Sequence, residues 1–193
     1  MKLWDKGFST DKKIDVFTVG NDRELDLVLA HYDVIASKAH AQMLGKVGLI
    51  SEEESKVLVK ELNHIEKSIQ KGEFTIEDDF EDMHSKIEFL LIESLGDVGK
   101  KIHTARSRND QVLVAMQLYL KNELQEIKAQ VKQLFDLLLN LAEKYQKTLL
   151  PGYTHLQIAM PSSFGLWFSA YAESLVDDLQ FIQAAYKVAD QNP

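Results

Sequence analysis

Hydrophobic residues recur every three or four positions along most of the chain, which is the spacing expected of helices packed on one side. The first such stripe occupies residues 23–44, with apolar positions at Leu25, Leu29, Tyr32, Ala36, Ala39 and Met43. A second is predicted to begin at Ser51, which forms a capping-box pattern with Glu54, and to stop at Gly72. A third runs through residues 80–95. The chain before these stripes, up to about residue 22, is predicted to be irregular, with three aromatic residues as packing anchors, namely Trp4, Phe8 and Phe17.

The longest predicted helix starts at Asp110 and extends to about Lys147. Its apolar positions alternate in steps of four and three, and this heptad seam requires partner helices. At ~1.5 Å per residue the helix is on the order of 55 Å long, which favours a bundle core shared between helices and between subunits. The seam positions are Leu120, Leu124, Ile127, Val131, Leu134, Leu138, Leu141 and Tyr145.

A last helix is predicted to start at Pro161 and Ser162, after a break at Pro151 and Gly152. Because the connection is short, this helix should run antiparallel to the long one. The chain stops where the last stripe ends, with nothing left to cover the seam, so we expect it to be a piece of something larger. With three prolines, nine glycines and little strand-like alternation, the fold class is predicted to be all-α.

Composition limits the classes of function. The 193 residues are 45% hydrophobic and 27% charged, which is typical of a globular protein with a real core. A formal net charge of −8 disfavours a nucleic-acid or membrane-surface binder, because phosphate contacts need a basic face. The sequence contains no cysteine, no signal-peptide pattern and no apolar stretch that could span a bilayer, so we expect a soluble cytoplasmic protein.

A polar turn of residues 101–111 joins the third helix to the long one. The unpaired N–H groups at a helix N-terminus attract anions, and arginine matches a carboxylate with a planar fork. This pattern indicates a site for a small acidic substrate; the alternative is an ordinary capping segment whose arginines pair with nearby acids. Its polar residues include Arg106, Ser107, Arg108, Asn109 and Asp110.

Two further polar groups are candidates for the same site. Thr154–Gln157 lies beyond the other end of the long helix, about 50 Å from the turn at the helical rise, so the two could share a pocket only if different subunits bring opposite ends together. Asp82 and His84, in the third helix, would face the site beside the turn. The alternative for His84 is a surface histidine or a buried one with its hydrogen bonds satisfied.

The segments His103–Gln111 and Gly152–Gln157, in this order and spacing, resemble those of the argininosuccinate lyases in the fumarase/aspartase superfamily. The resemblance implies an N-terminal helical domain, residues 1–102, and the incomplete start of a long-helix bundle domain, residues 103–193. It also implies cleavage of argininosuccinate to arginine and fumarate in arginine biosynthesis. Members of the family are homotetramers in which residues of three subunits form each active site. We expect no cofactor and no metal. Further matches are Trp4, Phe8, Asp26, Asp33 and the run Asp82-Met83-His84.

The resemblance assigns roles to individual side chains. The reaction is a β-elimination in which a carboxylate gains a second negative charge, so preorganised donors aimed at it supply much of the catalysis. His155 matches the acid/base histidine of the family, and Asp82 and His84 would be secondary site residues. The substrate-binding donors would be Ser107, Arg108, Asn109, Thr154 and Gln157.

Three departures from the family accompany these matches. The flexible serine loop of the family lies beyond residue 193, so we expect no lyase activity from this chain alone. The family has a substrate-contacting serine where this chain has Asn21 and Asp22, and Ile158 and Met160 replace more polar residues. The last two differences suggest an altered substrate.

Two other functions remain open at this point. One is a different lyase of the superfamily, such as adenylosuccinate lyase or aspartase. The other is a non-catalytic structural protein with the same fold, as among the lens crystallins. A metal enzyme is disfavoured because His103 and His155 lack carboxylates at ligand spacing.

Overall fold

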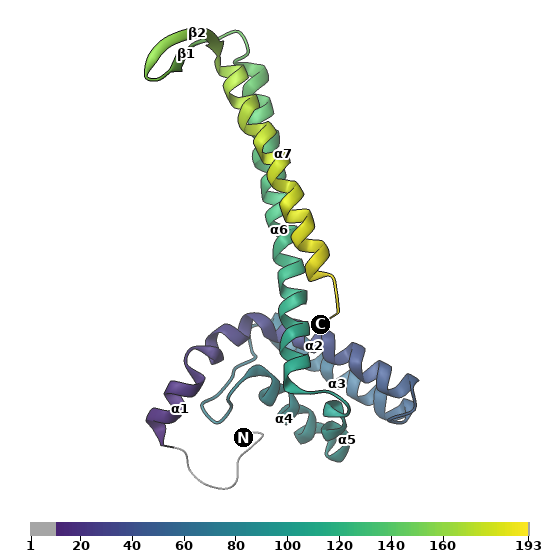
Figure 1. The fold of residues 1–193 in the computed structure, drawn as a ribbon. Coiled ribbons are helices and arrows are strands. Elements are labelled where there is room, and N and C mark those ends of the chain that lie inside the picture. The colour runs from purple at the N-terminus through teal and green to yellow at the C-terminus, as the bar shows by residue number, and fades with distance from the viewer. Residues whose placement is uncertain (1–10, 193) are drawn as a thin grey trace. The chain divides into compact units, whose positions relative to one another are not determined.

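The structure is a computed structural model that describes residues 11–192 (Figure 1). Helices dominate this part of the chain, which confirms the predicted helical class, and a two-stranded antiparallel sheet that the sequence did not predict joins the last two. Trp4 and Phe8 lie outside the described residues. The elements are α1 (Lys12–Val19), α2 (Asp22–Lys46), α3 (Glu52–Gln70), α4 (Met83–Leu95), α5 (Asp97–Lys100), the 3-10 helix η1 (Lys101–His103), α6 (Arg108–Lys144), β1 (Leu149–Thr154), β2 (Gln157–Ser163) and α7 (Phe164–Ala189).

The described residues form two compact units, which we call unit one (residues 11–119) and unit two (residues 120–191). Helix α6 begins in unit one and ends in unit two. The predicted division into domains at residues 102 and 103 stays a prediction.

Unit one has a closed hydrophobic core between α2, α3 and α4. The predicted capping box starts α3: the Ser51 N–H donates to Glu54 Oε2 at 2.9 Å, and the Glu54 N–H donates to Ser51 Oγ at 3.1 Å. Most positions of the second and third predicted stripes point inward. The first stripe is only partly right: Leu29 and Tyr32 pack against the core, whereas Leu25 and Met43 are 62% and 41% exposed, because α2 turns another face to the core. Each of the three helices contributes side chains with no more than 2% exposure. These include Val34, Ala41, Leu44, Leu58, Leu62, Met83, Ile87 and Leu91.

Residues 12–19, predicted to be irregular, form the short helix α1, whose start is capped by Asp11. The prediction that Phe17 anchors the packing is wrong: its side chain is 88% exposed. The physical reason is the direction of the side chain: Val19, two residues later and so on the other side of the helix, is 1% exposed, which leaves Phe17 pointing into solvent.

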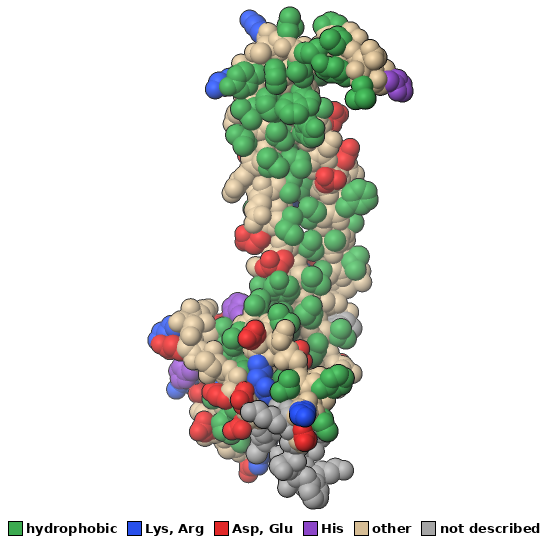
Figure 2. All heavy atoms as spheres, turned by 90° about the vertical axis from the view of Figure 1, so that its left-hand side faces the viewer, with side chains coloured by type: hydrophobic (Ala, Val, Ile, Leu, Met, Phe, Trp, Pro, Cys, Tyr) green, Lys and Arg blue, Asp and Glu red, His purple; other side chains and the backbone are tan. Residues whose placement is uncertain are grey.

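Unit two contains residues 120–144 of α6, the β1–β2 hairpin and α7 (Figure 1). Lys121 forms an ion pair with Asp190, and the rings of Tyr145 and Phe168 lie 6.4 Å apart. The end of α6 therefore lies beside the start of α7, and the end of α7 lies beside Lys121 within α6, which confirms the predicted antiparallel arrangement. Many hydrophobic side chains of α6 and α7 are exposed, and Figure 2 shows them along these helices on the face in view.

The hairpin replaces the predicted start of the last helix. Pro161 pairs with Pro151 in the sheet, and α7 begins only at Phe164, where Ser163 Oγ accepts a hydrogen bond from the Leu166 N–H at 3.1 Å. Among the described helices, none combines the length and apolar character needed to cross a bilayer.

Candidate functional site

The polar turn between η1 and α6 is closed by reciprocal hydrogen bonds. The Ser107 N–H donates to Asp110 Oδ2 at 2.8 Å, and the Asp110 N–H donates to Ser107 Oγ at 3.3 Å. The hydrogen bond from the Ser107 backbone, and after it one from the Ser107 side chain, hold the pKa of Asp110 below its ordinary value. Ala105 takes a left-handed conformation with φ of 54°, which reverses the chain just before α6.

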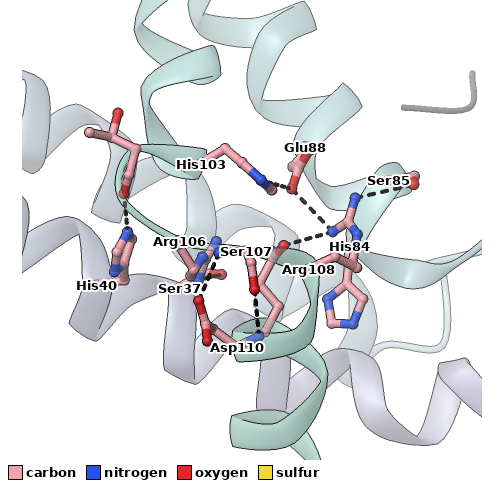
Figure 3. A network of polar contacts seen from close by, with 12 residues as sticks. Ser37, His40, His84, Ser85, Glu88, His103, Arg106, Ser107, Arg108 and Asp110 are labelled. Atoms are coloured by element: carbon pink, nitrogen blue, oxygen red, sulfur yellow. Dashed lines mark hydrogen bonds and ion pairs between the residues drawn. The ribbon is translucent and has the colours of Figure 1, made fainter. Parts of the chain in front are cut away.

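Arg108, in the first turn of α6, is the centre of a network within unit one (Figure 3). Its Nη1 donates to Gln111 Oε1 at 2.8 Å and to Glu88 Oε1 at 3.2 Å. Its Nη2 donates to Ser85 Oγ at 3.4 Å, and Nε lies 3.6 Å from Asp82 Oδ2. The structure thus brings the predicted residues Arg108 and Asp82 together. It also agrees with the alternative interpretation of the turn as a capping segment, in which the arginine pairs with nearby acids.

Asp82 caps α4 and at the same time faces the turn. Its Oδ1 accepts a hydrogen bond from the Ser85 N–H at 2.7 Å. The adjacent Met83 N–H donates to Asp26 Oδ2 at 3.0 Å, so α2 also holds the start of α4. Burial raises the pKa of Asp26, and the hydrogen bond from Met83 opposes that effect.

His84 lies inside unit one, with 2% of its side chain exposed. Its Nδ1 is 3.0 Å from Oδ1 of the fully buried Asp33. The ring is directed towards α2 rather than towards solvent, and the predicted contact of His84 with a substrate stays a prediction.

Two other histidines hold the polar turn. His103 Nδ1 lies 3.1 Å from Glu88 Oε1, so Glu88 links His103 to Arg108. His40 on α2 has its Nε2 2.9 Å from the Thr104 carbonyl oxygen, to which the neutral ring donates when Nε2 carries the proton. Burial lowers the pKa of His40, and the positive charge of Arg106 adds to that shift.

Sequence reasoning missed Ser85, Glu88 and His40 as members of this network. A signal for two of them was present: Asp82, Ser85 and Glu88 follow one another in steps of three, which places them on one face of α4. His40 carries no comparable signal, because only the packing of α2 against the turn brings it there.

The remaining predicted residues of unit one are exposed. Asn109 follows Arg108 in the first turn of α6, and Asp22 begins α2. Neither belongs to the network around Arg108, and their predicted contacts with substrate stay predictions.

The second predicted cluster forms the tip of the hairpin in unit two. Thr154 pairs with Gln157, so His155 and Leu156 are the two central residues of a tight turn. Both have left-handed backbones, with φ of 47° and 65°, as both central residues of a type I′ turn require. The four side chains are exposed. The hairpin register therefore fixes where His155 is presented, and the predicted sharing of a pocket with the polar turn stays a prediction.

The described residues contain no group of three histidine, aspartate or glutamate side chains arranged to hold a metal ion.

Comparison with known proteins places the chain in a family. A family described as lyase matches residues 7–193. The argininosuccinate lyase of Parabacteroides distasonis is 55% identical over 192 residues, which are 100% of this chain and 43% of that protein. The argininosuccinate lyase of Thermotoga neapolitana is 42% identical over 192 residues, covering 100% of this chain and 48% of its own length.

A solved structure shows the same fold at much lower identity. The fumarate lyase:delta crystallin from Brucella melitensis superposes with a TM-score of 0.75 at 17% identity, covering 94% of this chain and 46% of that one. The chain spans less than half the length of the curated relatives described above. With the family match over residues 7–193 and the argininosuccinate lyases similar along the whole chain, this protein belongs to the lyase family.

Proposed function

We propose that this chain is a portion of an argininosuccinate lyase, which splits argininosuccinate into arginine and fumarate by β-elimination. The observation that carries the proposal is the 55% identity to a protein of that name over the whole chain, both polar clusters included. The proposal extends to the place of this reaction in arginine biosynthesis and to a cytoplasmic location.

The geometry of unit one supports binding of a carboxylate at the start of α6. Gln111, Glu88 and Ser85 hold the guanidinium of Arg108, so its direction is fixed before any ligand arrives. Such preorganisation matters because the substrate carboxylate gains negative charge in the intermediate. Ser107 and Asn109 flank Arg108 with exposed polar side chains that can complete the contact.

The tip of the hairpin would supply proton transfer. A histidine imidazole can accept and return a proton near neutral pH, and His155 is presented on a two-residue turn with Thr154 and Gln157 beside it. In this proposal His155 protonates the leaving guanidino nitrogen or acts together with the base, while Thr154 and Gln157 bind substrate. Asp22, Asp82 and His84 complete the proposed substrate site.

Assembly of several copies belongs to the same proposal. The polar turn and the hairpin tip lie in different units, and we infer a homotetramer in which three subunits contribute to each site. The exposed apolar side chains of α6 and α7 support this inference, since a helical bundle would bury them.

A chimaera tests the proposal in a protein that has the full length of the relatives. Residues 1–193 would replace the matching portion of the Parabacteroides distasonis argininosuccinate lyase, and fumarate formation would be followed by its ultraviolet absorbance. We expect turnover of argininosuccinate, but not of adenylosuccinate or aspartate, and no turnover by residues 1–193 alone. His155→Asn in the chimaera should lower kcat by about 10²–10⁴-fold, as loss of general acid–base catalysis does.

His64→Asn is the matched control, because this histidine is exposed on α3 and forms an ion pair with Glu61 on the same helix. It should leave kcat unchanged. A chimaera that assembles as a tetramer but produces no fumarate would instead favour the structural, crystallin-like alternative. Turnover of adenylosuccinate or aspartate would favour another lyase of the superfamily.

A further inference from the structure

Asp33 is a buried carboxylate that the proposed chemistry does not use. It lies on α2 with 0% exposure, and its Oδ1 is 3.0 Å from Nδ1 of His84. The two atoms are at ion-pair distance without the alignment of a hydrogen bond, and neither carboxylate oxygen has a hydrogen-bond partner among the described residues. A buried carboxylate is costly unless positive charge compensates it, so its retention calls for a physical reason.

A second contact on the same face of α2 reaches the polar turn. Ser37, one helical turn after Asp33, accepts a hydrogen bond at 3.2 Å from Nη1 of Arg106. The Nε and Nη2 atoms of Arg106 are buried and lack a hydrogen-bond partner among the described residues. Burial lowers the pKa of Arg106, and the negative charges of Asp33 and then Glu88 oppose that shift.

These two contacts involve close sequence neighbours of Asp82 and Arg108. His84 is two residues after Asp82, and Arg106 is two residues before Arg108. Side chains on one face of α2 therefore contact both the start of α4 and the polar turn. Both contacts are made two residues from a member of the Asp82–Arg108 pair, in which Asp82 Oδ2 lies 3.6 Å from Arg108 Nε. The hydrogen bond from Arg106 to Ser37 is drawn in Figure 3, with His84 on the other side of the network.

We propose that Asp33 is a positioning residue of the candidate site: with Ser37 it holds His84 and Arg106, and so sets the distance and direction between Asp82 and Arg108. Asp33 touches no substrate in this arrangement. Its consequence for catalysis rests on the proposed function, whereas the positioning itself can be measured without substrate. The competing view is that Asp33 is an ordinary polar group of the core, whose loss would weaken all of unit one alike.

Amide hydrogen exchange on the whole chain separates these two views. In Asp33→Asn, which keeps the shape and removes the charge, the amides of residues 104–108 should exchange about tenfold faster while those of Leu58 and Leu62 stay close to wild type. The matched control is Glu66→Gln, which removes a carboxylate paired with Lys38 at 2.9 Å between α2 and α3, away from the network around Arg108. It should leave the exchange of residues 104–108 unchanged. Equal acceleration throughout unit one, or none in the turn, would overturn the proposal.

A double variant tests whether the charge of Asp33 acts through Arg106. Asp33→Asn leaves the buried guanidinium without its counter-charge, so adding Arg106→Gln should return the exchange of residues 104–108 towards the wild-type rate. Additive acceleration would contradict the proposal. If Asp33→Asn does not fold, Ser37→Ala takes its place, since it removes the acceptor of Arg106 and should loosen the same amides selectively; an unchanged turn would then refute the proposal.

In the chimaera described above, Asp33→Asn should lower kcat and raise KM for argininosuccinate, while Glu66→Gln changes neither. Unaltered kinetics alongside a loosened turn would also overturn the assignment of Asp33 to the site. If the chimaera without substitutions is inactive, the proposed function fails, and the exchange experiment still decides whether Asp33 positions the turn.

Discussion

The two units of this chain use the same hydrophobic spacing with opposite results. In unit one, Leu58 and Leu62 of α3 and Leu91 of α4 are 0% exposed. In unit two, Phe181 and Val188 of α7 are 75% and 67% exposed. The difference shows that spacing of three and four predicts a helix and the face to be covered, but not what covers it.

The number of helices explains the contrast. In unit one, α2, α3 and α4 enclose a core from three sides. In unit two, α6 and α7 face each other alone, and a pair of helices leaves part of each apolar stripe in solvent. Among its described residues, the buried ones are small: Gly165, Ala172 and Ala189.

The largest expected difference between the units comes from shortening a leucine in each. Leu62→Ala in unit one should lower the free energy of unfolding by about 2–5 kcal/mol, because it leaves a cavity in a packed core. Leu134→Ala on α6, where the side chain is 46% exposed, should change it by no more than about 0.5 kcal/mol in the dilute chain. Urea unfolding followed by circular dichroism measures both.

Raising the protein concentration makes this comparison sharper. If copies associate through α6 and α7, the cost of Leu134→Ala should rise with concentration, while that of Leu62→Ala should not. Equal costs for the two variants in the dilute chain would mean that unit two is packed as closely as unit one, and the contrast would be lost.

An effect of intermediate size is expected at Gly165, where α7 packs tightly against the end of α6. A Cβ atom on Gly165 would lie 2.5 Å from the Cα of Gln146 and 2.7 Å from the carbonyl oxygen of Ala142. Gly165→Ala should therefore separate α7 from the end of α6 and cost about 1–3 kcal/mol, despite the better helix propensity of alanine. Thermal unfolding and the exchange of amides in residues 142–146 report the change.

The exposed Ala170, on the same helix, provides the control for Gly165. Ala170→Ser adds one heavy atom, as Gly165→Ala does, but at an exposed position of α7. It should change the stability very little. Stabilisation by Gly165→Ala would show that propensity outweighs the contact, and that the two helices do not depend on close approach at this point.

The elements that the sequence predicted correctly are those whose signals are local. The capping box of Ser51 and Glu54 and the helical stripes of α3 and α4 depend on residues a few positions apart, and the structure confirms them. The hairpin escaped prediction because most of its side chains are exposed, which removes the alternation of a half-buried strand.

The residues of the candidate site also divide into those with a local sequence signal and those without one. Arg108 and Asp82 could be proposed from motifs, and the structure places them in one network. Ser37, His40 and Asp33 could not be assigned contacts with the turn, because nothing in their local sequence shows which face of α2 meets it. Phe17 was predicted to be buried from its side chain alone, whereas burial depends on which side of α1 faces inward, and that side carries Val19.

The smallest expected effect is a pH dependence confined to unit one. The pKa of His40 is lowered from its ordinary value of 6.5 by burial, so on acidification the unfolded chain takes up this proton before the folded one does. The contribution of neutral His40 to stability is therefore complete above about pH 6.5 and is lost as the pH falls through the lowered pKa of the folded state. Asp26, whose pKa is raised from 3.8, has the opposite sign: it adds stability as the pH falls through its own raised pKa.

His40→Gln isolates this effect, because its amide can still donate to the Thr104 carbonyl but does not titrate. Urea unfolding of unit one at about pH 7.5 and 5.5 should show a smaller loss of stability on acidification in this variant than in wild type. His64→Gln, at an exposed histidine of α3 that pairs with Glu61 on the same helix, is the control and should leave the loss unchanged. Amides in unit two should show no such dependence on His40, and a loss of equal size in His40→Gln and wild type would contradict the role of this histidine at the turn.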